Sequence, residues 1–152
     1  MTAPAVEAPA PPRADELVVL YDGVCGLCNG VVKFLLPRDR AKRIRFAALQ
    51  GAYAATALAR HGIVPPPGDP ESIVLVAQPG TTDERLYFKS EAALRIGAAL
   101  PGAWRLSGIL RVVPRVVRDW VYARVARSRY RIFGRYDACP MPTPESRARF
   151  LP

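Results

Sequence analysis

Histidine and cysteine, the residues that hold most structural metals, are scarce in this sequence. The chain of 152 residues has one histidine, His61, and three cysteines. A secreted scaffold held together by disulfides normally has more cysteines, in even number. A structural zinc site built on Cys25 and Cys28 needs two further ligands. Cys139, Asp22 and His61 are candidates, but no second Cys-x-x-Cys or His-x-His spacing supports them. We therefore predict neither a metal nor another cofactor, and we interpret His61 as a residue that complements a helix C-terminus.

Lysine and long apolar runs are scarce as well. The chain has three lysines against 19 arginines and a net charge of +9. This bias, together with the many alanines and prolines, is typical of a GC-rich genome, so we do not take it as a functional signal. A basic surface still favours anionic partners, such as nucleic acid, acidic proteins or anionic lipid.

Membrane-spanning and targeting segments are not predicted either. The apolar stretches are too short, or too interrupted by arginine, to span a bilayer. The stretch "MTAPAVEAPAPPRADE" has neither the basic region nor the apolar region of a signal peptide. We therefore expect a cytoplasmic location, where thiols are kept reduced and a close cysteine pair is more readily catalytic or metal-binding than structural.

The apolar patterns predict one domain over residues 16–152, preceded by a disordered Ala/Pro-rich tail over residues 1–15. The expected order is strand, helix, strand, helix, strand, strand, helix, over residues 17–22, 25–37, 43–49, 51–62, 72–77, 85–88 and 91–100. Pro37 is expected to stop the first helix, Gly62 to cap the second, and Ser90 to be the N-cap of the third. In the second strand, Ile44 and Phe46 alternate with arginines, as in a half-buried strand.

This order of elements predicts an α/β fold with a thioredoxin-like core. A parallel β-α-β unit followed by an antiparallel hairpin and a helix gives a β-α-β-α-β-β-α order and a four-stranded mixed sheet. The first strand is then central and leads into the loop before the first helix. Cys25 and Cys28 fall at this junction.

A basic helical extension is expected from about residue 103, with Pro114 in the first turn of a helix. One apolar stripe recurs at helical spacing along it, formed by Val113, Val116, Val117, Trp120, Val121 and Val125. We interpret this stripe as part of the core and the arginine face opposite it as solvated. The tail after this helix is expected to wrap the core as irregular segments.

The stretch "YDGVCGLCNG" over residues 21–30 carries the strongest chemical signal. A thiolate is the nucleophile of disulfide exchange, and a helix N-terminus favours negative charge. Cys25 at that terminus would be the accessible, attacking sulfur. Cys28, one turn further in, would resolve the mixed disulfide. The alternatives are half of a metal site or two small core residues that happen to lie close together.

Asp22 ends the first strand three residues before Cys25, and two roles are open for it. Its carboxylate could carry a proton to or from Cys28 during resolution. It could instead cap the Asp-Gly turn that leads into the helix.

"YDGVCGLCNG" resembles the signature of the DCC family of predicted thiol-disulfide oxidoreductases, which is an Asp-x-x-Cys-x-x-Cys motif. Asp22, Cys25 and Cys28 occupy its three positions. "RIRFAAL", "FKSEAALRI" and the C-terminal segment "WVYARVARSRYRIFGRYDACPMPTPESRARFL" are also similar to the family, so the resemblance covers residues 17–151. It implies a thioredoxin-like fold and dithiol–disulfide redox activity.

The sequence departs from thioredoxins proper in the region before the third strand. Thioredoxins have a cis-proline there, whereas this chain has Ser72 at the strand start and Pro70 two residues earlier. Cys139, in the C-terminal segment, is either a second resolving thiol or a small buried residue before Pro140. We favour the structural role for Cys139.

Three functions follow from these observations. The first is an enzyme that exchanges electrons with a protein or small-molecule disulfide and is recycled by an unidentified reductase or oxidant. The second is a basic module that binds nucleic acid or an anionic membrane through arginine and aromatic side chains, which the core interpretation of the stripe disfavours. The third is a structural zinc protein.

Overall fold

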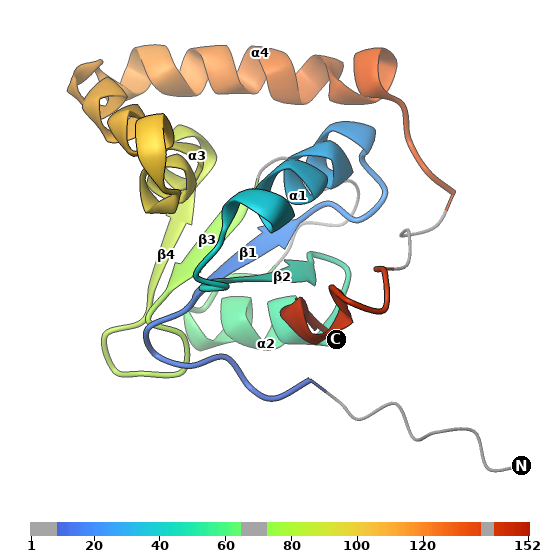
Figure 1. Ribbon diagram of the computed structural model, residues 1–152. Coiled ribbons are helices and arrows are strands. Elements are labelled where there is room, and N and C mark those ends of the chain that lie inside the picture. Colours follow the sequence, from blue (N-terminus) through green and yellow to red (C-terminus); the bar gives the residue numbers. More distant parts are fainter. Residues whose placement is uncertain (1–8, 65–72, 138–141) are drawn as a thin grey trace, which may run out of the picture.

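A five-stranded mixed sheet lies at the centre of the computed structural model, which describes residues 9–64, 73–137 and 142–152 (Figure 1). The strands follow the order β4-β3-β1-β2-β5. Their bounds are β1 (Leu17–Tyr21), β2 (Ile44–Ala48), β3 (Val74–Ala77), β4 (Arg85–Phe88) and β5 (Phe150–Leu151). Because β1 pairs parallel with β2 and antiparallel with β3, the first strand is central, as the sequence predicted. This arrangement is a thioredoxin-like α/β fold.

The fifth strand was not predicted. Phe150 and Leu151 extend the sheet as a parallel edge strand beside β2, so the prediction of four strands and an irregular tail is wrong at this point. The Phe150 ring packs on Phe46, with 5.4 Å between the ring centroids. Arg149 donates a hydrogen bond of 2.8 Å to the Ile44 carbonyl. These contacts fix the C-terminus of the chain against the edge of the sheet.

Helices cover both faces of the sheet. Helices α1 (Gly26–Arg38) and α3 (Lys89–Ala99) lie on one face, and α2 (Ala52–Arg60) lies on the other (Figure 1). Successive residues of β1 therefore enter different cores: Val19 packs under α1 and α3, and Val18 packs under α2. A strand buried on both faces is apolar along its whole length, which explains the run "LVVLY".

Three local predictions need correction. Helix α1 continues through Pro37 into its last turn and ends at Arg38. Strand β2 is buried on both faces rather than half-buried, because Arg45 is buried against Glu16 with 3.4 Å between their charged groups. Ser90 lies inside α3 and donates its hydroxyl to the carboxylate of Asp119, so it does not cap the helix.

Other local predictions are confirmed. Gly62 adopts a left-handed φ of +69° directly after α2, which is the conformation of a glycine cap. His61 is the C-cap residue of α2, and its Nε2 lies 2.9 Å from Glu84 Oε1.

Part of the segment that was expected to be a disordered tail makes a contact with the domain, since the Ala10 carbonyl accepts a hydrogen bond from Arg45. Residues 1–8 of that tail lie outside the described residues.

The C-terminal extension consists of η1 (Gly102–Val112), a stretch of 3₁₀ helix, and α4 (Arg115–Phe133). Helix α4 runs across α1 and α3 on the side away from the sheet (Figure 1). Pro114 is its N-cap residue. Within the described residues, no helix is both long enough and apolar enough to cross a membrane.

The orientation of α4 is the main correction to the sequence analysis. The apolar stripe faces solvent: Val116 is 81% exposed and Trp120 is 63% exposed. The face expected in solvent packs inward instead. Arg118 forms an ion pair of 3.2 Å with Glu91, and the Tyr122 hydroxyl accepts a hydrogen bond of 2.8 Å from the backbone N–H of Ile73. Polar partners on the domain surface therefore decide which side of α4 is buried.

Candidate functional site

The loop after β1 places the two cysteines at the N-terminus of α1. Cys25 is the N-cap residue of the helix, with extended backbone angles, and its carbonyl accepts the N–H of Asn29 at 3.0 Å. Cys28 lies one turn further along the helix, and both cysteines are free thiols. The backbone N–H groups of the first turn and the helix dipole favour negative charge at this end of the helix.

Two amide side chains hold the loop in place. Asn29 is buried and donates from its Nδ2 to the carbonyls of Gly23, at 2.8 Å, and Cys25, at 2.9 Å. Gln50 accepts the backbone N–H of Gly23 at 3.2 Å and donates to the Asp22 carboxylate at 2.9 Å. The loop conformation is therefore fixed by hydrogen bonds on both sides of the cysteine motif.

Asp22 is buried and joins the loop to helix α4. Its Oδ1 accepts the backbone N–H of Val24 at 3.1 Å, which is the turn-capping contact that the sequence suggested. Its Oδ2 lies 3.5 Å from the guanidinium of Arg129 and also accepts the hydroxyl proton of Tyr130. We call these three residues the Asp22–Arg129–Tyr130 cluster. It links positions that are more than 100 residues apart in the chain.

The electrostatics of the pair keep a proton on Cys28. Burial above all, together with the negative charge of Cys25 and a hydrogen bond to it, raises the pKa of Cys28 from 9.0 to about 12. The Asp22 backbone and the positive charge of Arg129 act in the opposite direction. Burial would lower the pKa of Arg129, but Tyr130 and both cysteines outweigh this and raise it. A permanent cation therefore lies within electrostatic reach of both sulfurs.

The exposure of the two cysteines is the reverse of what the sequence suggested. Cys25, expected to be accessible, is 0% exposed, and Cys28 is the more exposed of the two. Residues 134–136, which we call the C-terminal strap, pair with the loop at Cys25. Gly26 donates its backbone N–H to the Gly134 carbonyl at 3.1 Å, and Tyr136 donates to the Val24 carbonyl at 2.7 Å. The strap is thus an extended segment bridged antiparallel to the cysteine motif.

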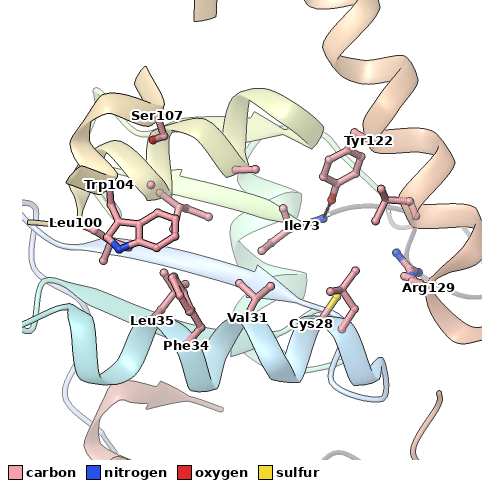
Figure 2. Close-up of a pocket in the computed structure, with 16 residues that line it drawn as sticks. Cys28, Val31, Phe34, Leu35, Ile73, Leu100, Trp104, Ser107, Tyr122 and Arg129 are labelled. Atoms are coloured by element: carbon pink, nitrogen blue, oxygen red, sulfur yellow. Dashed lines mark hydrogen bonds between the residues drawn. The ribbon is translucent and has the colours of Figure 1, made fainter. Parts of the chain in front are cut away.

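An apolar pocket of about 330 Å³ opens beside Cys28 (Figure 2). Its walls come from α1, α3, η1 and α4, and they include Leu27, Val31, Phe34, Ile96, Leu100 and Trp104. Cys28, Tyr122 and Arg129 gather at one end, whereas the Trp104 ring lies at the other (Figure 2). This volume is within the range of about 300–1,000 Å³ that is common for small-molecule sites.

The sequence analysis missed several residues of this site. Asn29 directly follows Cys28, and an asparagine at an inward position of a helix was a usable signal. Arg129 and Tyr130 gave none, because their contacts with Asp22 depend on how α4 packs. Cys139, Pro70 and Ser72 lie outside the described residues. Within the described part of the chain, no group of three or more His, Cys, Asp or Glu side chains could hold a metal ion.

Comparisons with known proteins agree with the signature around Cys25. Residues 19–135 match the family model of DCC1-like thiol-disulfide oxidoreductases. The chain is 39% identical to the uncharacterized protein YuxK of Bacillus subtilis (strain 168), over 89% of this chain and 93% of that protein. It is 42% identical to the DCC family protein At1g52590, chloroplastic, of Arabidopsis thaliana, over 82% of this chain and 69% of that protein. No solved structure gives a significant match.

Gly26 allows the C-terminal strap to approach Cys25. A Cβ atom at this position would lie 2.0 Å from the Phe133 carbonyl oxygen, so Gly26→Ala must push the end of α4 and the strap away. We expect G26A to speed the alkylation of Cys25 by iodoacetamide severalfold, followed by peptide mass spectrometry. Gly30→Ala in the same helix is the control, because its Cβ meets nothing within 4 Å. Equal labelling of Cys25 in G26A, G30A and the unmodified chain would show that the strap does not shield it.

The pKa of Cys28 should depend on Cys25. Cys25→Ser removes the neighbouring charge and changes the hydrogen bond that help to raise this pKa to about 12, while burial remains. We therefore expect the pKa of Cys28 to fall in C25S but to stay above its ordinary value of 9.0. Ultraviolet absorbance of the thiolate, recorded against pH in a Cys139→Ser background, measures this shift. An unchanged or higher pKa in C25S would mean that the two sulfurs do not interact.

Proposed function

This chain belongs to the DCC1-like thiol-disulfide oxidoreductase family, and we propose that it carries out dithiol–disulfide exchange through Cys25 and Cys28. The observation that carries the proposal is the sulfur pair itself: Cys25 at the N-cap of α1, within electrostatic reach of the Cys28 thiol and of Arg129. Cations and helix N-termini favour a thiolate over a thiol. Cys28, whose raised pKa keeps its proton, is then the partner of a nucleophilic Cys25.

We propose that Cys25 attacks and Cys28 resolves. The Cys25 thiolate forms a bond with one sulfur of a substrate disulfide, the substrate S–S bond breaks, and the first substrate thiolate leaves and takes up a proton. Cys28 then loses its proton and attacks the Cys25 sulfur, which releases the second substrate thiol. Two electrons pass from the pair to the substrate, and a separate dithiol reductant must reduce the Cys25–Cys28 disulfide. With an oxidant in place of that reductant, the same steps run in reverse.

The pKa of Cys28 is raised at the stage before Cys28 has to react, which fits its role as the resolving cysteine. While Cys25 is a thiolate, its charge holds the proton on Cys28. In the mixed disulfide this charge is gone, so the pKa of Cys28 falls when its thiolate is needed. Arg129 remains in place to stabilise that thiolate. The order of the two steps is then set by one charge.

Access to Cys25 requires the strap to move. Two backbone hydrogen bonds, from Gly26 to Gly134 and from Tyr136 to Val24, hold it on the motif. An extended peptide that carries a disulfide could replace these bonds in the same antiparallel arrangement. The apolar pocket beside Cys28 supports a substrate with an apolar group next to its disulfide, in a protein or a small molecule. The cytoplasm, which keeps such a pair reduced, is the location that we propose.

For Asp22 we propose a positioning role. The contacts of its carboxylate are structural ones: it caps its own turn, accepts hydrogen bonds from Gln50 and Tyr130, and pairs with Arg129. A carboxylate bound in this way keeps the guanidinium of Arg129 close to the two thiols. In the alternative role, Asp22 carries the proton of Cys28 during resolution, and the variant Asp22→Asn distinguishes the two roles.

Turnover tests the proposed function. We expect the chain to reduce insulin disulfides with dithiothreitol as the electron donor, and the double variant C25S/C28S to lose at least about 100-fold in rate, because neither sulfur is left to exchange. Cys139→Ser makes the same chemical change outside the pair and should keep most of the rate. Reduction by C25S/C28S at the rate of the unmodified chain would contradict the proposal.

Asp22→Asn separates the two roles of this residue. The substitution removes the negative charge that faces the buried Arg129 guanidinium, so we expect the free energy of unfolding to fall by about 3–5 kcal/mol in denaturant titrations. The double variant D22N/R129M should regain part of this loss. The pH dependence of mixed-disulfide resolution should keep its shape in D22N. A D22N protein of full stability that accumulates the Cys25 mixed disulfide would instead identify Asp22 as the proton carrier.

A further inference from the structure

An exposed apolar patch covers the corner between η1 and α4, at the opposite end of α4 from Arg129. We call it the η1–α4 patch, formed by Leu106, Ile109, Leu110, Val112, Val116 and Trp120. Val112 is 85% exposed and Val116 is 81% exposed. In Figure 1 this corner, gold turning to orange, stands away from the sheet. Monomeric proteins rarely leave so many large apolar side chains together in water unless they bind something there.

The same two elements carry most of the net positive charge of the protein. Residues 102–133 contain eight arginines and one acidic residue, Asp119, so +7 of the net charge of +9 falls on this segment. Arg115 pairs with Asp119 at 3.4 Å. Arg105, Arg124 and Arg127 are exposed, and in the described part of the chain none of them forms an ion pair. The partner of this corner must therefore offer both negative charge and an apolar phase.

We propose that the η1–α4 patch docks on the surface of an anionic lipid bilayer. Its aliphatic side chains and Trp120 enter the boundary between headgroups and acyl chains, and the flanking arginines contact lipid phosphates. Since no described helix is long and apolar enough to span a membrane, the contact lies on the surface. This mode combines the two properties of the patch in one partner.

Two other partners, a second copy of the chain and a nucleic acid, match only one of these properties. A second copy of the chain would bring an equally positive surface against this one, which is unfavourable. A nucleic acid offers phosphates but no apolar phase, and the bases of a single strand stack on aromatic rings, whereas most of the patch is aliphatic. The proposal does not rest on the redox function, because the patch contains neither cysteine nor the residues of the Asp22–Arg129–Tyr130 cluster.

Vesicle flotation with the full chain tests the docking. We expect the chain to float with vesicles of phosphatidylcholine and phosphatidylglycerol at low salt, with partitioning on the order of tenfold stronger than on phosphatidylcholine alone, and to be released by high salt. The double variant V112E/V116E should lose at least about tenfold in partitioning. Both residues are exposed, so the fold should persist, as circular dichroism and the rate of insulin reduction would check.

Val64→Glu is the matched control. Val64 is 86% exposed and lies outside the patch, so V64E should float like the unmodified chain. The proposal is overturned if the chain does not bind anionic vesicles at low salt, or if V64E and V112E/V116E lose binding equally. It is also overturned if the patch instead mediates a dimer in sedimentation, or binding to a single-stranded oligonucleotide, that V112E/V116E abolishes.

Discussion

The buried ion pair between Asp22 and Arg129 is the interaction on which the rest of the structure depends. It joins the loop after β1 to a helix that begins more than 90 residues later, and Tyr130 completes it with a hydrogen bond to the same carboxylate. Breaking one partner of such a pair costs far more than the pair gains by forming, because the other charge is left buried. Together with the contacts of Arg118 with Glu91 and of Tyr122 with Ile73, the pair fixes the rotation of α4 about its own axis.

Several features follow from this rotation. The positive charge of Arg129 comes close to both sulfurs, and α4 closes one wall of the apolar pocket beside Cys28. The end of the helix delivers the C-terminal strap to Cys25, and Gly26 leaves room for it. The apolar stripe of α4 is turned outward, which leaves the η1–α4 patch in solvent. The arrangement of the redox site and the exposure of the η1–α4 patch thus both follow from the orientation in which α4 packs.

The sequence was informative where structure depends on neighbours along the chain. The run "LVVLY", the helix that begins beside Cys25 and the hairpin of β3 and β4 follow from local periodicity and turn residues. The rest depends on distant contacts. Periodicity finds the stripe on α4 but cannot say which side is buried, since that is decided by Glu91 and Asp22. Arg45 is buried only because Glu16, 29 residues away, neutralises it. The two residues of β5 are too few to show any period.

For the cysteine pair, too, some features depend on neighbours along the chain and others on distant contacts. The spacing of Cys25 and Cys28 predicted their positions in the first turn of a helix. The burial of Cys25, in contrast, depends on the C-terminal strap, which follows more than 100 residues later in the chain. The most direct test of the proposed dithiol–disulfide exchange is a redox titration in glutathione buffers, with the disulfide state measured by mass spectrometry of peptides. We predict one two-electron transition, which joins Cys25 to Cys28 and persists in C139S. If no Cys25–Cys28 disulfide formed at any potential, this result would contradict the proposed exchange.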